Sequence, residues 1–420
     1  MQSTFHVNNR NTLYDTLPDG TIFIVFAGQA PRHSADAFYS FFTNRNFVYL
    51  TGLMGIETEG FIFMATKENG KVDEVVYALP SDLMAERWNG KRFTFAEIKD
   101  MSGVESVRPL LGFEGTFHRL AASGRFTTLA LDLERFRADE PDSHAHRIAK
   151  QAAARYPGLA VIDRNRQLRI QRTIKAPCEI EGMKKATEAT REAVLAMMKA
   201  TRPGAYEYNL KAAFDHALTS RGLLFPGFPP IIATGENNFC IHYYGYRGQI
   251  ADGDMILIDS GATVDGMCND VSRTWPANGR FNERQRALYS IAYETSEYVF
   301  SIIKPGMPMR DVDGTVKVHA FEGLKKLGLV DEIEQVGKII WHGGAHHIGY
   351  DVHDAVEVVD GIIKAGMMFC VDVGIYCEEW GIGFRLEDNC LVTEDGCINL
   401  SASIPRSIED IEAVFLENSK

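Results

Sequence analysis

The chain has 420 residues, of which 45% are hydrophobic and 24% charged, and its formal net charge is -12. This length allows two ordinary domains or one large one, and the composition is that of a globular protein. A strongly negative protein is a poor partner for nucleic acid or for an anionic membrane, so we expect neither as a main partner.

No targeting or membrane-spanning segment is visible in the sequence. The N-terminal stretch MQSTFHVNNRNTLYD lacks the basic region and the apolar core of a secretory signal. No apolar run approaches the roughly 18 to 20 residues of a membrane span. The seven cysteines begin at Cys178 and include no C-x-x-C pair. We therefore expect buried, reduced thiols and a cytoplasmic location.

The first part of the chain alternates short apolar stretches with helical or loop stretches, which predicts a mixed α/β domain. A helix is predicted over 144–156. The predicted strands are Thr21–Phe26, Phe47–Leu50, Gly60–Ala65, Glu74–Ala78, Thr127–Leu133 and Leu159–Ile162. Because the acids and histidines of this region form no obvious constellation, we interpret residues 1–167 as a separate, non-catalytic domain.

A polar segment followed by Pro177 marks the start of a second domain, residues 168–420. The spacing of apolar residues predicts helices over Glu179–Ala200, Tyr206–Arg221, Glu283–Ile303 and Met309–Leu327, and a strand over Lys338–Trp341. Two helices thus precede each of two strand hairpins. The domain is therefore expected to contain an internal repeat.

The repeat is also visible as a motif. The pattern G-x-M-x-x-x-D-x-G occurs over residues 253–261 and again over residues 366–374. In each copy an apolar strand leads into an acid, Asp259 or Asp372, and then into a glycine. An ionisable side chain at the end of a buried strand is unfavourable unless it is paired or coordinated.

Each hairpin supplies a second acid on its return limb, Asp270 in the first copy and Glu387 in the second. Four converging carboxylates repel one another, so cations are the simplest explanation for them. Between the copies the segment WHGGAHHIGYDVHD offers nitrogen donors from His342, His346, His347 and His353. An oxygen-rich donor set with one imidazole suits Mn, Co or Zn.

Several common catalytic motifs are absent from the sequence. It contains no G-x-S-x-G elbow, no Walker loop, no G-x-G-x-x-G and no H-E-x-x-H. These absences argue against a serine hydrolase, a P-loop NTPase, a Rossmann enzyme and a zincin.

Taken together, the motifs resemble those of the aminopeptidase P and prolidase family, whose catalytic domain has the pita-bread fold shared with methionine aminopeptidases and creatinase. The matching motifs, in order, are Asp259-Ser260-Gly261, Asp270, His342 to Asp354, Asp372-Val373-Gly374 and Arg385-Leu386-Glu387-Asp388. The N-terminal stretches LPDGTIFIVFAG and NRNFVYLTGL are also similar to aminopeptidase P. The resemblance covers nearly the whole chain. It implies an N-terminal mixed α/β domain and a C-terminal pita-bread catalytic domain with an internal pseudo-twofold repeat.

The resemblance implies two divalent ions that hold a bridging hydroxide. Mn is the expected metal, and Co or Zn are alternatives. The implied metal ligands are Asp259, Asp270, His346, Asp372 and Glu387, with Asp270 and Glu387 bridging. The implied catalytic residues are His242, His342, His353, Asp372 and Arg385.

Each implied catalytic residue has an expected role. The three histidines line the substrate site and stabilise the tetrahedral intermediate or shuttle a proton. Asp372 accepts a proton from the attacking water, and Arg385 orients a carboxylate or contacts substrate. His347 is expected to be structural, because its neighbour takes the ligand position.

Asp372 is the position where the chain departs from the family pattern. The family usually has Glu in an E-P-G motif, whereas this chain has Asp372 followed by Val373. The missing methylene withdraws the carboxylate by roughly 1 to 1.5 Å from a fixed backbone. In the internal repeat Asp372 falls opposite Asp259, where Asp is the usual ligand, so we still expect it to bind metal.

The expected function is that of an Xaa-Pro aminopeptidase, which removes an N-terminal residue preceding proline. The expected partners are a peptide with proline in second position and further copies of the chain in a homodimer or homotetramer. One alternative is a prolidase acting on Xaa-Pro dipeptides. A less favoured alternative is a catalytically weakened pita-bread module that binds a partner, since such modules usually lose several ligands.

Overall fold

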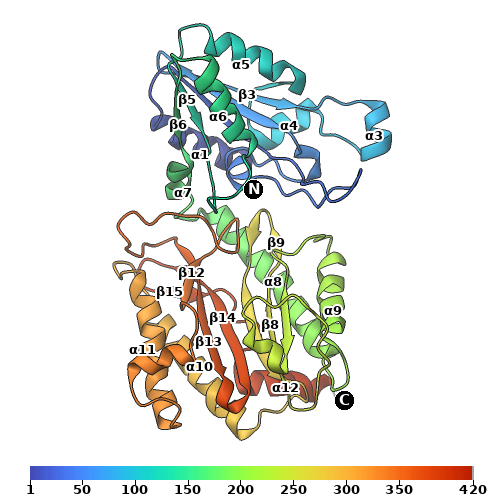
Figure 1. The fold of residues 1–420 in the computed structure, drawn as a ribbon, viewed down its shortest axis with the longest axis vertical. Helices are drawn as coiled ribbons and strands as arrows, with labels where there is room; N and C mark the ends of the chain where they lie inside the picture. The colour runs from blue at the N-terminus through green and yellow to red at the C-terminus, as the bar shows by residue number, and fades with distance from the viewer. Residues whose placement is uncertain (419–420) are drawn as a thin grey trace. The chain divides into compact units, whose positions relative to one another are not determined.

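The computed structural model describes residues 1–418. Contacts between Cα atoms divide the chain into two compact units, Met1–Arg172 and Thr173–Lys420 (Figure 1). The sequence placed the division slightly earlier, after residue 167. The helix α7 (Asn165–Gln171) groups with the first unit.

The first unit is built around a six-stranded mixed sheet with the strand order β4-β3-β2-β1-β5-β6. The antiparallel pairs are β1 with β2 and β2 with β3, and the other neighbours are parallel. The strands are β1 (Thr21–Phe26), β2 (Ile62–Glu68), β3 (Lys71–Ala78), β4 (Ser106–Pro109), β5 (Thr128–Leu131) and β6 (Ala160–Asp163). The other helices are α1 (Ser3–Asp15), α2 (Arg45–Thr51), α3 (Leu83–Asn89), α4 (Phe95–Ser102), α5 (Phe113–Ala121) and α6 (His144–Arg155), with short 3-10 helices η1 (Ile56–Thr58) and η2 (Leu110–Gly112).

The predicted strand over Phe47–Leu50 is wrong, because these residues lie in the helix α2. Asn44 caps the helix by accepting a hydrogen bond from the backbone of Phe47, and Gly52 ends it with a left-handed φ of 70°. Both are ordinary helix boundary signals. The apolar run is buried on all sides, so its hydrophobicity alone did not distinguish helix from strand.

The second unit contains two small antiparallel sheets and a two-stranded ribbon, with the orders β11-β8-β7, β12-β13-β14-β15 and β10-β9. The strands are β7 (Ile231–Thr234), β8 (Met255–Ser260), β9 (Thr263–Val264), β10 (Met267–Cys268), β11 (Val271–Pro276), β12 (Ala345–His347), β13 (Met368–Cys377), β14 (Ile382–Val392) and β15 (Cys397–Asn399). The helices are α8 (Pro177–Ala200), α9 (Glu207–Thr219), α10 (Glu283–Ile302), α11 (Arg310–Lys326) and α12 (Ile408–Asn418), with 3-10 helices η3 (Gly235–Phe239), η4 (Ile333–Lys338) and η5 (Glu378–Trp380).

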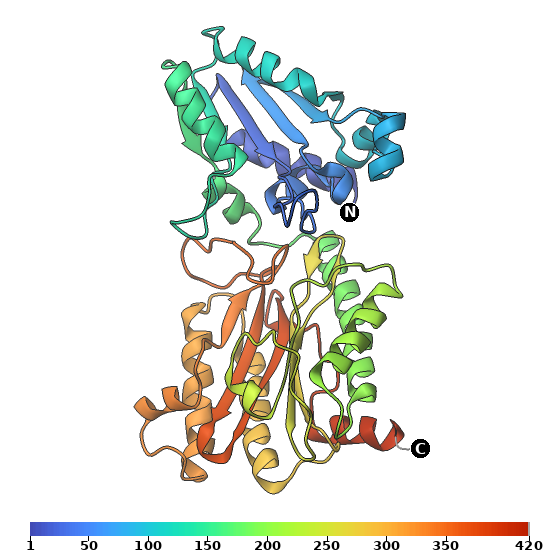
Figure 2. The same cartoon turned by 45° about the vertical axis from the view of Figure 1, so that its right-hand side comes forward.

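The predicted internal repeat is present in the second unit. The helices α8 and α9 precede the β8–β11 hairpin, and α10 and α11 precede the β13–β14 hairpin. The first helix pair lies beside the sheet that contains β8, and the second lies beside the sheet that contains β13 (Figures 1 and 2). One apolar core includes residues of both halves, among them Ile258 and Val371, so the two halves form a single folded unit.

The predicted strand over Lys338–Trp341 is also wrong. This segment follows the 3-10 helix η4, and the amide groups of both Ile339 and Ile340 donate hydrogen bonds to the Val336 carbonyl. The strand at this place in the repeat is β12, which begins only at Ala345. His342 consequently lies in a loop, while His346 lies in a strand.

Two general expectations can be compared with the structure. Among the described residues, no helix combines the length and the apolar character needed to cross a bilayer. All seven cysteines are free, and four of them are buried, but Cys240 is exposed and Cys178 and Cys397 are only partly covered. The expectation that every thiol is buried is therefore wrong.

Candidate metal centre and active site

The two hairpins of the repeat run side by side. On β11, the Thr274 hydroxyl donates to the Arg385 carbonyl of β14 at 3.0 Å. The Arg273 guanidinium donates to the Glu387 carbonyl at 2.8 Å. These hydrogen bonds connect strands that belong to different sheets, and they bring the return limbs of both hairpins together.

The strand register places the acids. Asp372 pairs with Glu387 across β13 and β14, so these two carboxylates are direct cross-strand neighbours. Asp259 of β8 pairs instead with Ser272 of β11, and Asp270 precedes that strand. The return-limb acids of the two copies are therefore not at equivalent register positions, although the leading acids are.

The glycine that follows each leading acid is required by close packing. A Cβ atom on Gly261 would overlap the Asn269 carbonyl oxygen. A Cβ atom on Gly374 would overlap His342 Nε2 and lie 2.8 Å from a ring carbon of Tyr376. The D-x-G motif thus reflects the absence of space beside both strands.

The four carboxylates are buried, and three of them are incompletely paired. Asp259, Asp270, Asp372 and Glu387 are each at most 9% exposed. One buried oxygen, Oδ1, of each of the three aspartates has no hydrogen-bond partner among the described residues. Buried oxygens normally have partners, so these atoms fit the donor set of bound cations.

The pKa values of these carboxyl groups also favour bound cations. Burial raises the pKa of Asp270 and of Asp372 well above the usual carboxyl value, and the negative charge of Glu387 raises both further. For Glu387 burial also acts to raise the pKa, but the hydrogen bond and charge of His346 lower it to about 2. The side chains alone therefore do not keep all of these acids ionised at neutral pH, whereas divalent cations would.

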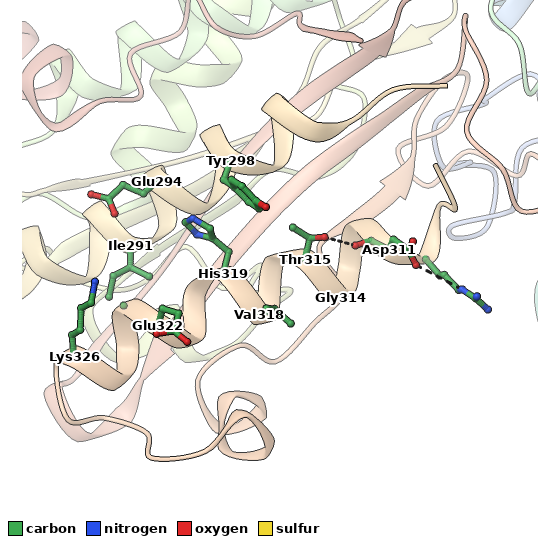
Figure 3. Close-up of a pocket in the computed structure, with 12 residues that line it drawn as sticks. Ile291, Glu294, Tyr298, Asp311, Gly314, Thr315, Val318, His319, Glu322 and Lys326 are labelled. Carbon is green, nitrogen blue, oxygen red and sulfur yellow. Dashed lines mark hydrogen bonds and ion pairs between the residues drawn. The ribbon is translucent and has the colours of Figure 1, made fainter. Parts of the chain in front are cut away.

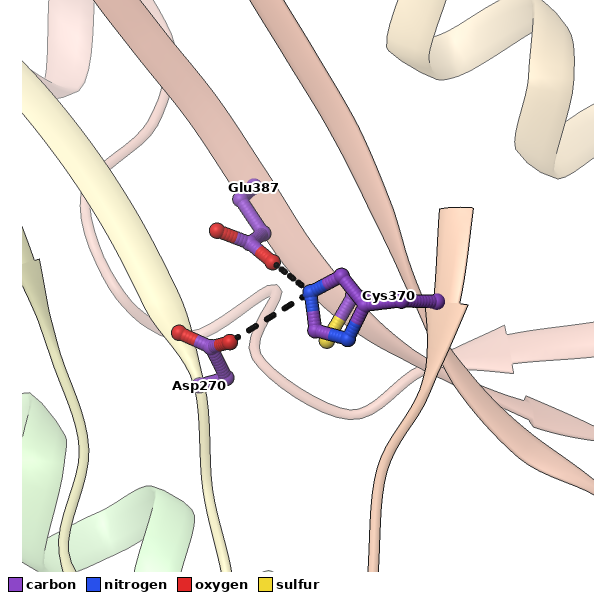
Figure 4. A group of neighbouring side chains, drawn as sticks. Asp270, Cys370 and Glu387 are labelled. Carbon is purple, nitrogen blue, oxygen red and sulfur yellow. Dashed lines mark hydrogen bonds and ion pairs between the residues drawn. The ribbon is translucent and has the colours of Figure 1, made fainter. Parts of the chain in front are cut away.

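His346 lies directly over the acids. Its Nε2 atom is 3.0 Å from Glu387 Oε1 and 3.5 Å from Asp270 Oδ2. Burial lowers the pKa of His346, but the hydrogen bond and charge of Glu387 outweigh it and raise the pKa to about 9. Asp270, His346, Cys370 and Glu387 each offer one donor atom, and these four atoms all lie within 4.8 Å of one another (Figure 4). This is the one such group of three or more ligands within residues 1–418.

His342 is held beside Asp372. Its Nδ1 atom lies 2.8 Å from the Gly343 carbonyl and 3.2 Å from Asp372 Oδ2. A carbonyl can only accept, so Nδ1 carries the proton, and Nε2 accepts from the Tyr376 hydroxyl at 3.1 Å. Burial lowers the pKa of His342, which favours this neutral form.

Arg385 is buried beneath the acids. Its guanidinium donates to Asp259 Oδ2 at 2.7 Å, to the Tyr376 hydroxyl at 3.2 Å and to the Ile241 carbonyl at 3.1 Å. It therefore orients the carboxylate of Asp259 and fixes the backbone next to His242.

His242 and His353 lie at the exposed rim of the site. The ring of His353 meets the ring of His346 edge-on, with centroids 4.4 Å apart. Burial and the charge of His346 lower the pKa of His353. The next residue, Asp354, forms a buried ion pair of 2.8 Å with Lys175, which anchors the loop that carries His353.

His347 points away from this group. Its ring contacts the ring of Phe369 edge-on, with centroids 6.2 Å apart. Burial lowers the pKa of His347. Both observations agree with the structural role expected for this residue.

Sequence reasoning missed three side chains that enter the site. Ser272 donates to Glu387 Oε2 at 2.9 Å, Tyr376 connects Arg385 to His342, and Cys370 belongs to the group around His346. The alternation of a strand was an available signal, because residues two before and four after Asp372 share its face. Ser272 could be placed in the site only from the pairing register of its strand, which the sequence does not reveal.

A separate hollow of about 810 Å³ lies between α10 and α11 (Figure 3). Tyr298 and His319 stack within it, with ring centroids 4.6 Å apart. No group of three metal-binding side chains converges there among the described residues. The chemistry therefore favours the buried carboxylates as the functional site.

Comparison with known proteins places these observations in a family. The sequence pattern of Metallopeptidase family M24 matches residues 181–394, and that of the Aminopeptidase P, N-terminal domain, matches residues 6–129. The Xaa-Pro aminopeptidase of Escherichia coli (strain K12) is 30% identical over 431 residues, covering 98% of this chain and 97% of the relative. The Xaa-Pro aminopeptidase of Haemophilus influenzae is 26% identical, covering 96% and 95%.

Solved structures agree with the sequence matches. A Bacillus anthracis protein with 37% identity superposes with a TM-score of 0.96, covering 100% of this chain and 99% of that one. Zinc-substituted Escherichia coli aminopeptidase P in complex with product has 28% identity and a TM-score of 0.89, with the same coverage. The chain therefore belongs to metallopeptidase family M24 and, within it, to the aminopeptidase P family, with an N-terminal mixed α/β domain and a C-terminal pita-bread catalytic domain.

Proposed function

We propose that this protein is a dinuclear-metal aminopeptidase that hydrolyses the Xaa-Pro bond at the N-terminus of peptides. The observation that carries the proposal is the convergence of Asp270, His346 and Glu387 with buried aspartate oxygens that have no hydrogen-bond partner within residues 1–418. Relatives named Xaa-Pro aminopeptidase that align over nearly the whole chain support it.

The proposed ligands of two divalent ions are Asp259, Asp270, His346, Asp372 and Glu387, with Asp270 and Glu387 shared between the ions. Mn is the first choice, and Co and Zn are alternatives, because most donors are carboxylate oxygens. When bound, such a pair lowers the pKa of a water molecule and polarises a scissile carbonyl.

The other proposed catalytic residues surround the carboxylates. Asp372 would accept the proton of the attacking water at its unpartnered Oδ1 atom. The three histidines would bind the substrate and pass the proton to the leaving amine. His342 is the nearest to the proton acceptor, with Nδ1 3.2 Å from Asp372 Oδ2, and the other two, His242 and His353, lie at the rim. Arg385 would hold Asp259 in its ligand position.

Metal dependence tests the proposal first. Activity on an Xaa-Pro peptide is expected to vanish with a chelator and to return with Mn or Co. Asp270→Asn and Glu387→Gln each remove a shared ligand, so both variants are expected to lose metal binding and activity. Full activity of the metal-stripped protein would contradict the proposal.

The substrate class is tested by competition between matched Xaa-Pro and Xaa-Ala peptides. A higher kcat/KM is expected for the Xaa-Pro peptide. Equal values for the two peptides would show that the site does not select for proline after the scissile bond. Assays of Xaa-Pro dipeptides against longer peptides separate the aminopeptidase from a prolidase, since the prolidase would act on the dipeptides alone.

We also propose a homodimer or homotetramer in a cytoplasmic setting. The seven free thiols are compatible with a reducing compartment. Light scattering of the purified protein tests the assembly, and a monomer at micromolar concentration would refute that part of the proposal.

A further inference from the structure

The group around His346 is completed by a sulfur atom. The donor atoms of Asp270, His346, Cys370 and Glu387 lie within 4.8 Å of one another, and Asp372 is not part of this group. Figure 4 shows the side chains of Asp270, Cys370 and Glu387 extending toward a common point. A thiol is therefore the fourth potential donor of this group.

The position of Cys370 follows from the strand geometry. Cys370 pairs with His346 across β12 and β13. It also lies two residues before Asp372, so both side chains leave β13 on the same face. The backbone thus directs the sulfur toward the acids, and a change of rotamer is not needed to bring it there.

The thiol is enclosed by polar partners of the site. Cys370 is fully buried. Its Sγ atom accepts a hydrogen bond of 3.4 Å from Asn389 Nδ2. A donor atom of Glu387 lies within 4.8 Å of the sulfur. The sulfur therefore faces polar groups of the candidate site.

An independent observation marks the same place as a ligand site. Asp270 is 3% exposed, and its buried Oδ1 atom has no partner among the described residues. Metal bonds to nitrogen, oxygen and sulfur measure about 2.0 to 2.3 Å, so tetrahedral donors on one ion lie roughly 3.3 to 3.8 Å apart. The four donor atoms all lie within 4.8 Å of one another, so they would close by up to about 1.5 Å around the ion.

We infer that Cys370 is a direct ligand of one of the two metal positions, together with Asp270, His346 and Glu387. This inference rests on the dinuclear site of the proposed function. One nitrogen, one sulfur and two oxygen donors suit tetrahedral Zn²⁺ or Co²⁺ better than Mn²⁺, which prefers oxygen. The position nearest His346 is therefore selective for Zn²⁺ or Co²⁺, and the remaining position, with oxygen donors alone, accepts Mn²⁺.

Cobalt spectroscopy of the full chain tests this assignment. The metal-stripped protein is titrated with Co²⁺, and a sulfur-to-cobalt charge-transfer band is expected in the near-ultraviolet. Cys370→Ser is expected to lose this band while it still binds Co²⁺. Cys390→Ser is the matched control, because Cys390 is buried on the neighbouring strand β14 and is not in the group.

Metal preference is the second measurement. Loss of an outer-shell partner already lowers metal affinity by about 10- to 100-fold, so loss of a direct sulfur ligand should lower Zn²⁺ affinity by at least about tenfold. Mn²⁺ affinity should change much less. The Zn-to-Mn affinity ratio, measured by competition calorimetry, is expected to fall in Cys370→Ser and to stay unchanged in Cys390→Ser.

Three results from the variants would overturn the assignment. The band could persist in Cys370→Ser, the control could lose it, or the affinity ratio could stay the same in both variants. X-ray absorption of the zinc-loaded wild type needs no variant, and absence of a Zn–S distance near about 2.3 Å would also refute the assignment. If the wild type binds metal through oxygen and nitrogen alone, the proposed function stands and only the role of Cys370 fails. If it binds no metal, both fail.

Discussion

Asp259 and Asp372 occupy equivalent places in the repeat, but their neighbours differ. Asp259 Oδ2 accepts a hydrogen bond of 2.7 Å from Arg385, whose charge is permanent. Asp372 Oδ2 lies 3.2 Å from His342, which can change its protonation state. The first acid is therefore suited to a fixed ligand position, and the second is suited to proton transfer.

Substitution of Asp372 by Glu tests the effect of the missing methylene. A metal ligand tolerates a deviation of only about 0.2 Å, so the shorter side chain is expected to bind its ion weakly. Asp372→Glu should then tighten the weaker metal position several-fold and reduce the amount of Mn needed for full activity. Calorimetric Mn titration of both proteins is the measurement. The expectation would be contradicted if the wild type bound Mn equally tightly at both positions and the variant bound it more weakly at one of them. That result would mean that the backbone has already adapted to Asp.

Gly261 and Gly374 provide a matched pair of substitutions. A methyl group at Gly261 would meet a backbone carbonyl, which cannot move without breaking the hairpin, whereas at Gly374 it would meet the side chains of His342 and Tyr376. Gly261→Ala is expected to destabilise the protein by more than about 3 kcal/mol, and Gly374→Ala by about 1 to 3 kcal/mol. Gly374→Ala should also reduce kcat, because His342 is displaced. Urea unfolding measures the stability of both variants, and steady-state kinetics measures kcat. A larger loss of stability in Gly374→Ala than in Gly261→Ala would contradict the steric argument.

At the scale of the elements, β14 carries two adjacent acids, one in the candidate site and one among buried arginines. Glu387 and Asp388 are adjacent, so they leave the strand on opposite faces. Glu387 faces His346 and Ser272, to which its carboxylate is hydrogen-bonded. Asp388 accepts hydrogen bonds from Arg273 at 2.7 Å and from Arg406 at 3.0 Å, and it is fully buried. One strand thus holds both the candidate active site and the ion pairs that support it from behind.

Removal of the Asp388 charge is expected to destabilise the fold. Asp388→Asn leaves Arg273 buried without a counter-charge, which typically lowers the free energy of unfolding by about 3 to 5 kcal/mol. Asp360→Asn is the control, because it breaks an exposed ion pair with Lys364 and should leave stability unchanged. Urea unfolding at neutral pH measures both variants. Equal effects would show that burial of the Asp388 pair is unimportant.

The pH dependence of this difference has a defined sign. Burial acts to raise the pKa of Asp388, but the charges of Arg273 and Arg406 outweigh it and hold the pKa below its usual value. A carboxyl group with a lowered pKa in the folded state stabilises the fold above its unfolded pKa of about 3.9. That contribution is lost as the pH falls through the folded pKa. The stability difference between wild type and Asp388→Asn should therefore be largest at neutral pH and shrink below about pH 4.

At the scale of the whole molecule, the two units have separate apolar cores. The core of the first unit contains residues between Ile22 and Leu159, and the core of the second contains residues between Ala189 and Ile411. All candidate site residues lie in the second unit. A unit with its own core can in principle fold alone.

A fragment of residues 173–420 is therefore expected to fold and to bind metal with the stoichiometry of the full chain. Circular dichroism measures its folding, and calorimetry measures its metal content. The fragment of residues 1–172 is the control and should bind no metal at the same affinity. An unfolded C-terminal fragment would show that the second unit depends on the first.

Much of this protein could be predicted from local patterns. The helices α8 to α11 and most strands were predicted because amphipathic spacing and strand alternation are local properties. The strands over Phe47–Leu50 and Lys338–Trp341 were predicted wrongly, since a short apolar run fits a buried helix or loop equally well. Asn44 and Gly52 could have corrected the first error, because helix caps are also local signals.

The sequence by itself determined the order of the acids and histidines, the duplicated strand motif that presents Asp259 and Asp372, and the likeness to a metallopeptidase family. Only the tertiary structure decided which side chains share the site with them. Ser272 enters it because it pairs with Asp259 across β8 and β11, and Asp388 meets two arginines, Arg273 and Arg406, from other segments of the chain. Register is set by pairing between segments far apart in the chain, and a shift of one residue would move every side chain to the opposite face. No local pattern contains that information.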